Sequence, residues 1–120
     1  MSKKTMLIGA SDNPERYAYQ AAALLMSHGH EVVLLGKKSG MVNNQPILTD
    51  RPMLEGIDTV TLYINPLHQV DWYDYIIDLK PKRVVFNPGT LNEIFELMLA
   101  EYQIEAVLGC TLVMLKVGTY

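Results

Sequence analysis

The sequence predicts a three-layer α/β/α domain with a mostly parallel five-stranded sheet at its centre. Five short runs rich in Val, Ile and Leu recur along the chain, and most are continuous rather than alternating, which is typical of strands buried on both faces. Helical patterns of apolar residues separate most of these runs. A strand, a helix and a further strand in succession imply parallel strands joined by right-handed crossovers.

The apolar runs give the expected strands in chain order: Thr5–Gly9, Glu31–Gly36, Asp58–Ile64, Lys82–Asn87 and Ile104–Gly109. Three helices are expected between them, over Pro14–His28, Pro66–Leu79 and Leu91–Tyr102.

Proline, glycine and a capping motif set the limits of these helices. Pro14 suits a first helical turn and Gly29 a helix stop, while Pro81 closes the second helix. The third helix opens on "TLNE", in which Thr90 is expected to cap the helix and Glu93 to reach back.

Two segments fit this alternation less well. Residues 37–56 form no clean helix: we expect a loop, a short extended piece at "PIL" and one helical turn in "DRPMLEG". The tail at residues 110–120 is expected as a last β segment or an irregular cover of the sheet edge. We therefore predict one Rossmann-like domain over residues 1–120.

The composition and charge of the chain limit the kinds of molecule that it is expected to bind. The 120 residues are 49% hydrophobic and 19% charged, which is globular, and the formal net charge of -3 argues against a nucleic-acid partner. No stretch is long and apolar enough to span a membrane. Cys110 is the only cysteine, so no disulfide forms within the chain, and a cytoplasmic location is expected.

The first loop has the layout of a phosphate-binding turn. Gly9 permits a tight turn, Ala10 follows, and Ser11 offers a hydroxyl and a backbone N–H, directly before a helix whose positive end favours an anion. A capped helix start without any ligand is the alternative interpretation.

Three Asn-Pro pairs follow three of the expected strands: Asn13-Pro14, Asn65-Pro66 and Asn87-Pro88, the last continuing into Gly89. In a sheet of this class, ligands bind at the carboxyl ends of the strands. The pairs therefore favour a shaped pocket at this rim, although turn formation alone also explains each of them.

The end of the second strand indicates the kind of ligand. A protein that selects NAD usually places Asp or Glu there, whereas this chain has Gly36, Lys37 and Lys38. Two ammonium groups suit an additional phosphate on a ribose. Plain NAD is disfavoured, and coenzyme A or NADP is favoured. A solvated lysine pair remains the alternative.

Other chemistry finds little support. The chain has no Gly-x-x-x-x-Gly-Lys-Ser/Thr motif, and its three histidines lack metal spacing. Cys110 has no identifiable companion base, and it is expected as a small, partly buried residue. Among the aromatic residues of the helices, Tyr19 alone is expected to line a pocket beside the first loop.

Several motifs occur in an order that is typical of one family: Gly9-Ala10-Ser11, Asn13-Pro14-Glu15-Arg16 and Tyr19, a leucine-rich helix into Gly29, the strand "EVVLLG", Asn92-Glu93, and Cys110. With these motifs the chain resembles the small stand-alone CoA-binding proteins with a Rossmann-type fold, relatives of the CoA-binding domain of succinyl-CoA synthetase alpha subunits.

The resemblance implies that Gly9, Ala10 and Ser11 lie against a pyrophosphate, and that the rim after the second and third strands receives the adenosine part. The family commonly has Asn-Pro after the second strand and an Arg-Pro-type sequence after the third. This chain has Gly36-Lys37 and Asn65-Pro66 there. We hypothesise that Lys37 or Lys38 takes the place of the arginine that the family has after the third strand.

The first functional hypothesis is non-catalytic binding of coenzyme A or an acyl-CoA. A small NADP-dependent reductase is the alternative, with Tyr19 or His68 as its only candidate proton donors. A third possibility is a scaffold or interaction domain that has lost its ligand. A homodimer or an unidentified protein partner is compatible with all three.

Overall fold

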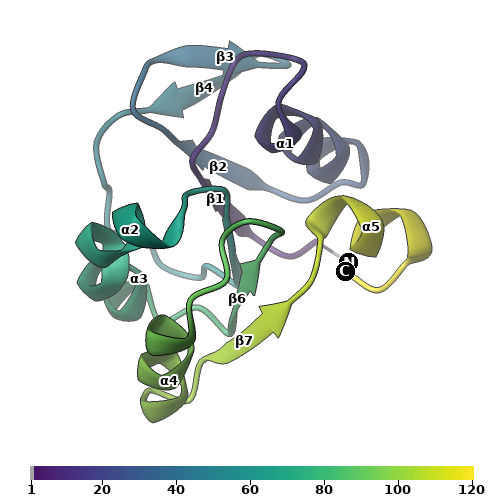
Figure 1. Cartoon of the computed structure of the whole chain (residues 1–120). Coiled ribbons are helices and arrows are strands. Elements are labelled where there is room, and N and C mark those ends of the chain that lie inside the picture. Colours follow the sequence, from purple (N-terminus) through teal and green to yellow (C-terminus); the bar gives the residue numbers. More distant parts are fainter. Residues whose placement is uncertain (1) are drawn as a thin grey trace.

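The computed structural model describes residues 2–120, which form an α/β fold on one mixed sheet (Figure 1). Its strands are β1 (Thr5–Ile8), β2 (Val32–Leu35), β3 (Gly40–Val42), β4 (Gln45–Leu48), β5 (Thr59–Leu62), β6 (Arg83–Phe86) and β7 (Glu105–Leu108). Its helices are α1 (Tyr17–Ser27), α2 (Pro66–Gln69), the 3-10 helix η1 (Val70–Trp72), α3 (Tyr73–Leu79), α4 (Glu93–Glu101) and α5 (Thr111–Val117).

The strand order is β3-β4-β2-β1-β5-β6-β7, with every neighbouring pair parallel except β3 and β4. The five expected strands are all present, as β1, β2, β5, β6 and β7. The chain runs outward from β1 through β2 to β4, and then crosses back to β5 on the other side of β1. The direction of winding therefore reverses between β1 and β5, as in Rossmann-like folds.

The two faces of the sheet are covered by different helices (Figure 1). Helices α1 and α5 lie on one face, where Ala21, Ala22 and Leu25 pack on Leu7 and Leu34. Helices α2, α3 and α4 cover the other face.

On that other face, Ile76, Phe95 and Leu99 pack on Val60 and Phe86. Alternate residues of each central strand enter opposite cores, which explains why these strands read as continuous apolar runs. The three predicted layers are confirmed.

The sheet has seven strands rather than the five predicted. The piece at "PIL" is the parallel strand β4, and part of the expected loop before it is the edge strand β3. Asn43 and Asn44, between them, both take positive φ angles of 47° and 69°. Two such residues in a two-residue turn suit the twist of a hairpin, and this asparagine pair is the sequence signal that the prediction missed.

Three helix boundaries differ from the prediction. Helix α1 begins at Tyr17, because the Arg16 N–H bonds the Asn13 carbonyl at 3.0 Å and closes a separate turn before the helix. The second predicted helix is divided by η1. Helix α4 is capped by Asn92, whose Oδ1 accepts from the Phe95 N–H at 3.1 Å, while the Thr90 hydroxyl donates to the Asn87 carbonyl instead.

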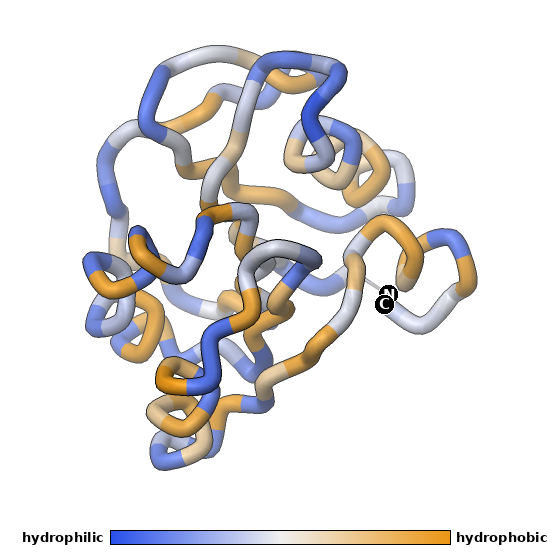
Figure 2. The backbone as a smooth tube through the Cα atoms, viewed as in Figure 1, coloured by the Kyte–Doolittle hydropathy of each residue, from blue (hydrophilic) through white to orange (hydrophobic). Residues whose placement is uncertain are grey.

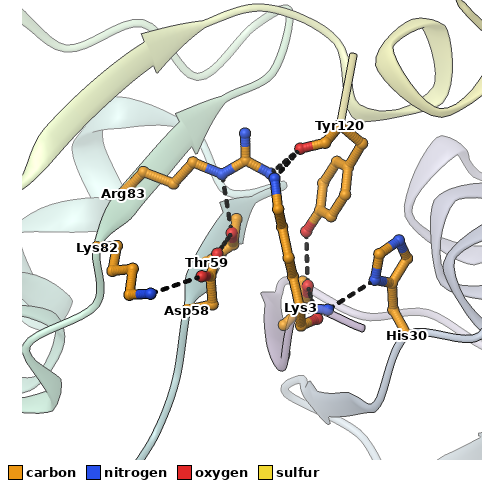
Figure 3. Close-up of polar contacts among 8 residues, drawn as sticks. Lys3, His30, Asp58, Thr59, Lys82, Arg83 and Tyr120 are labelled. Carbon is orange, nitrogen blue, oxygen red and sulfur yellow. Dashed lines mark hydrogen bonds and ion pairs between the residues drawn. The ribbon is translucent and has the colours of Figure 1, made fainter. Parts of the chain in front are cut away.

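The segment after Cys110 forms helix α5, and the expectation of a β segment or an edge cover there was wrong. No helical turn forms in "DRPMLEG". Beyond α5 the chain returns to the amino end of the sheet (Figure 3). There the Tyr120 hydroxyl shares a hydrogen bond with Thr5, and the Arg83 guanidinium lies 4.5 Å from the centroid of the Tyr120 ring.

Candidate functional site

A cleft of about 650 Å³ opens at the carboxyl ends of β1, β2 and β5, where the winding of the sheet reverses. Ligands of doubly wound sheets bind at this place. Three segments of the chain line the cleft: the β1–α1 loop with the first turn of α1, the turn after β2, and the segment from the end of β5 into α2.

The β1–α1 loop forms the floor of the cleft, and Gly9 is required there. Gly9 has a φ of +97°, and a Cβ at this residue would lie 2.6 Å from the Tyr63 carbonyl oxygen. The N–H groups of Gly9 and Ala10 both bond the Leu35 carbonyl at 2.9 Å. The loop therefore lies low against β2 and β5, and it leaves room above it for a ligand.

The top of this loop holds the donors that remain available to a ligand. Within residues 2–120, the backbone N–H groups of Ser11 and Asp12 make no hydrogen bond. The Ser11 hydroxyl accepts from the Asn13 N–H at 3.1 Å, and Asn13 Oδ1 accepts from the Glu15 N–H at 3.0 Å. The turn before α1 is thus fixed by its own side chains, and adjacent free N–H groups are suited to an anion.

Two basic walls face this floor. Lys37 and Lys38 follow β2, and Arg16 precedes α1. In the part of the chain that the structure describes, the ion pairs are Lys4–Glu31 and Lys82–Asp58, so the three cleft cations have no carboxylate partner. Unpaired cations beside free backbone donors have the chemistry that suits a phosphate group.

Close backbone packing holds the turn after β2 against the floor. A Cβ at Gly36 would lie 2.7 Å from the Ala10 carbonyl oxygen. A Cβ at Gly40 would lie 2.8 Å from Asp12 Oδ2, so the carboxylate of Asp12 is turned toward the start of β3. Gly36 is needed because the turn at residues 37–39, the lysine turn, starts against the backbone of the β1–α1 loop, whereas at Gly40 the neighbour is the side chain of the exposed Asp12.

The third wall comes from β5 and α2. Asn65 caps α2 by accepting from the His68 N–H at 3.2 Å. Tyr63, Ile64 and His68 complete this wall. Burial raises the pKa of the Tyr63 phenol far above its usual range.

The structure brings seven of the fifteen predicted site residues into the lining of the cleft: Gly9, Ala10, Ser11, Arg16, Lys37, Lys38 and Asn65. Asn13 and Pro14 are exposed in the turn behind the loop, and Gly36 supports the lysine turn from below. Pro66 begins α2 next to the wall.

Tyr17 takes the position that was expected for Tyr19. Tyr17 is 72% exposed and lines the cleft, whereas Tyr19 packs against the core under α1. The two tyrosines lie on opposite flanks of the buried stripe of α1, and periodicity does not indicate which flank meets the first loop.

Asn87, Pro88 and Gly89 lie outside the lining of the cleft. The Asn87 side chain is 1% exposed and is fully hydrogen-bonded inside the protein. Its Nδ2 donates to Thr61 Oγ1 at 2.7 Å and to the Leu62 carbonyl at 2.8 Å, and its Oδ1 accepts from the Thr111 N–H at 2.8 Å. This asparagine joins β5, β6 and α5.

Seven residues of the lining were not among the predicted binding residues, and of these only His68 had been named, as a candidate proton donor: Asp12, Tyr17, Ala18, Ser39, Tyr63, Ile64 and His68. Most are direct neighbours of predicted residues, so extending each predicted loop by a residue or two would have included them. Among residues 2–120, no cluster of His, Cys, Asp and Glu side chains has the geometry to hold a metal ion. None of the described helices is long and apolar enough to span a membrane.

The strand order and the cleft at the switch point define a Rossmann-like α/β protein. A protein family described as a CoA binding domain matches residues 3–116. The chain therefore belongs to this CoA-binding domain family, as the sequence motifs indicated.

Solved structures agree with this fold. A crystal structure of an uncharacterized protein is 56% identical, with a TM-score of 0.98 over 100% of this chain and 99% of that chain. A hypothetical protein from Pyrococcus horikoshii OT3 is 25% identical, with a TM-score of 0.80 over 93% of this chain and 80% of that one. A Thermus thermophilus protein with 20% identity and a TM-score of 0.86, over 99% and 91% of the two chains, shares the fold. Comparison with curated proteins gives no match.

Proposed function

We propose that the chain binds coenzyme A or an acyl-CoA in the cleft at the carboxyl ends of β1, β2 and β5. The observation that carries the proposal is the set of three cations, Arg16, Lys37 and Lys38, without carboxylate partners around the Gly9 turn. Membership in the CoA-binding domain family supports the same ligand.

The residues present fit such a ligand. The missing side chain at Gly9 leaves space over the floor of the cleft, and the free N–H groups of Ser11 and Asp12 suit the pyrophosphate. Lys37 and Lys38 follow β2, where Rossmann-like proteins bind the ribose, and they suit its 3′-phosphate. They take the role of the arginine that is missing after β5.

We assign binding to the cleft and no reaction. The side chains that line it form no hydrogen-bonded nucleophile and base pair among residues 2–120. The same basic wall would suit the 2′-phosphate of NADP, so the reductase alternative is tested in the same experiment. A scaffold that has lost its ligand is the remaining alternative.

Isothermal titration with CoA, acetyl-CoA, 3′-dephospho-CoA, NADP and NAD tests the proposal. We expect CoA and acetyl-CoA to bind more tightly than dephospho-CoA, because the lysine turn loses its phosphate partner. Lys37→Ala and Lys38→Ala should each weaken CoA binding about tenfold, which is about 1.4 kcal/mol, and change dephospho-CoA binding little.

Lys80→Ala is the matched control, because Lys80 is exposed at the amino end of the sheet and carries the same charge. It should leave CoA binding unchanged. Absence of binding by either CoA species at millimolar concentration would contradict the proposal and leave the scaffold alternative. Tighter binding of NADP than of CoA would favour the reductase.

A further inference from the structure

Strand β7 is an open edge of the sheet. It pairs only with β6 in the described chain. Glu105 and Gly109 donate their N–H groups to the carbonyls of Lys82 and Phe86 on that side. In a parallel ladder, alternate residues face opposite neighbours. The N–H and C=O groups of Ala106 and Leu108 therefore point away from β6 toward the free edge.

Apolar side chains surround this edge on the face covered by α4. Asn92 Nδ2 bonds the Tyr73 hydroxyl on the α3 side of the helix. Ile94 and Met98, one turn apart, lie on the opposite flank, toward β7. Ile94 is 68% exposed, and Leu108 of β7, on the same face of the sheet, is 59% exposed.

On the other face of the sheet, helix α5 packs against α1 through Leu112 and Leu115. Its Val113 and Val117, one turn apart, are exposed. Figure 2 shows hydrophobic segments along β7 and on both α4 and α5. An exposed edge strand beside an apolar helix flank is rare in a monomer, because natural proteins protect such edges.

The opposite edge, β3, has that protection. It is three residues long and includes Gly40, and Lys37 and Lys38 lie three and two residues before it. Short length and nearby lysines are common means of blocking edge pairing. The two edges of this sheet are therefore not equivalent.

We propose that β7 pairs antiparallel with β7 of a second copy of this chain, around a two-fold axis at Val107. In this register Ala106 faces Leu108 of the second copy, so every outward backbone group of β7 gains a partner. The single charge of the strand, Glu105, then faces Gly109 rather than another Glu105. The edge is thus self-complementary, which identifies a second copy as its partner.

The same axis places the apolar flank of α4 beside α4 of the second copy. A specific interface takes about 800 Å² from each partner, roughly an eighth of the 6831 Å² surface. The edge strand and the exposed side chains beside it, Ile94 at 68% and Leu108 at 59%, supply the apolar centre of such a patch. The inference does not depend on the ligand of the cleft.

Cross-linking tests the register. At the axis, Val107 and its symmetry mate form a non-hydrogen-bonded pair with Cα atoms about 4.5 Å apart, which is within the range for a disulfide. In a Cys110→Ser background, Val107→Cys should form a disulfide-linked dimer on mild oxidation. Ala106→Cys is the control: it lies opposite Leu108 and should stay largely uncross-linked. Cross-linking of Ala106→Cys instead of Val107→Cys would overturn the register.

Light scattering with size-exclusion chromatography tests the interface. The unmodified chain should have twice the mass of one copy, and Leu108→Lys and Ile94→Lys should be monomeric yet folded by circular dichroism, because both residues are exposed. Met41→Lys, on the opposite edge at 53% exposure, should remain a dimer. A monomeric unmodified chain, or a dimer that persists in both β7-side variants, would overturn the proposal.

Discussion

Gly9 lies where β1, β2 and β5 come together, and its missing side chain shapes the cleft. Its φ of +97° excludes larger residues, and so does the distance of only 2.6 Å that would separate a Cβ from the Tyr63 carbonyl oxygen. The first restriction is a property of the backbone, and the second depends on β5, which lies about fifty residues away in the chain. Sequence inspection detects only the glycine.

Gly9→Ala should lower the free energy of unfolding by about 2–4 kcal/mol, because left-handed strain and a backbone clash add. Urea denaturation measures the loss. Gly29→Ala is the control: its φ is +82°, but nothing lies within 4 Å of a Cβ there, so only about 1–2 kcal/mol is expected. Equal losses in the two variants would contradict the close packing described for the first loop.

The role of a side chain was predictable from the sequence only where that role depends on residues next to it in the chain. The Gly-Ala-Ser turn and the lysine pair each depend on neighbouring residues, and the structure places both at the cleft. The place of Tyr17 in the cleft depends on how α1 is rotated against the sheet, and the burial of Asn87 depends on the position of α5. Neither the place of Tyr17 nor the burial of Asn87 can be predicted from the few residues on either side of it in the sequence.

At the scale of elements, α5 is tied to the sheet by polar rather than apolar contacts at its start. Asn87 Oδ1 accepts from the Thr111 N–H, and Thr111 Oγ1 shares a hydrogen bond of 2.8 Å with Thr61. Asn87 thus completes the link between β5, β6 and α5. We interpret it as a structural residue.

Asn87→Ala should lower the free energy of unfolding by about 2–4 kcal/mol, because the Thr111 N–H and the Leu62 carbonyl lose a buried partner. Thermal or urea denaturation gives the value. Asn65→Ala removes only an exposed helix cap, and about 1 kcal/mol is expected there. A loss at Asn87 no greater than that at Asn65 would show that the buried network does not hold α5.

The elements missed from the sequence are those without a clear pattern of their own. The central strands are buried on both faces, and their continuous apolar runs identify them. Strand β3 has three residues and depends on the turn at Asn43 and Asn44. Helix α5 has only seven residues, too few for periodicity to separate a helix from a strand.

At the scale of the whole molecule, the strand order concentrates the cleft at one end of the sheet and leaves β7 free at one side. Alternation of strands and helices together with right-handed crossovers places helices on the faces of a parallel sheet, so the layers were predictable from the sequence. Strands β3 and β4 were not predictable in this way. They form a hairpin after β2, where a helix usually connects one parallel strand to the next.

An amide NMR titration of the ¹⁵N-labelled chain with CoA tests the central claim most directly, because it reports each segment of the cleft separately. We expect saturable shift changes concentrated in residues 9–18, 37–39 and 63–68, the segments that line the cleft. They should be weaker at the lysine turn with dephospho-CoA. No saturable change at millimolar CoA, or changes centred on Lys80 and Lys82 at the amino end of the sheet, would contradict the account.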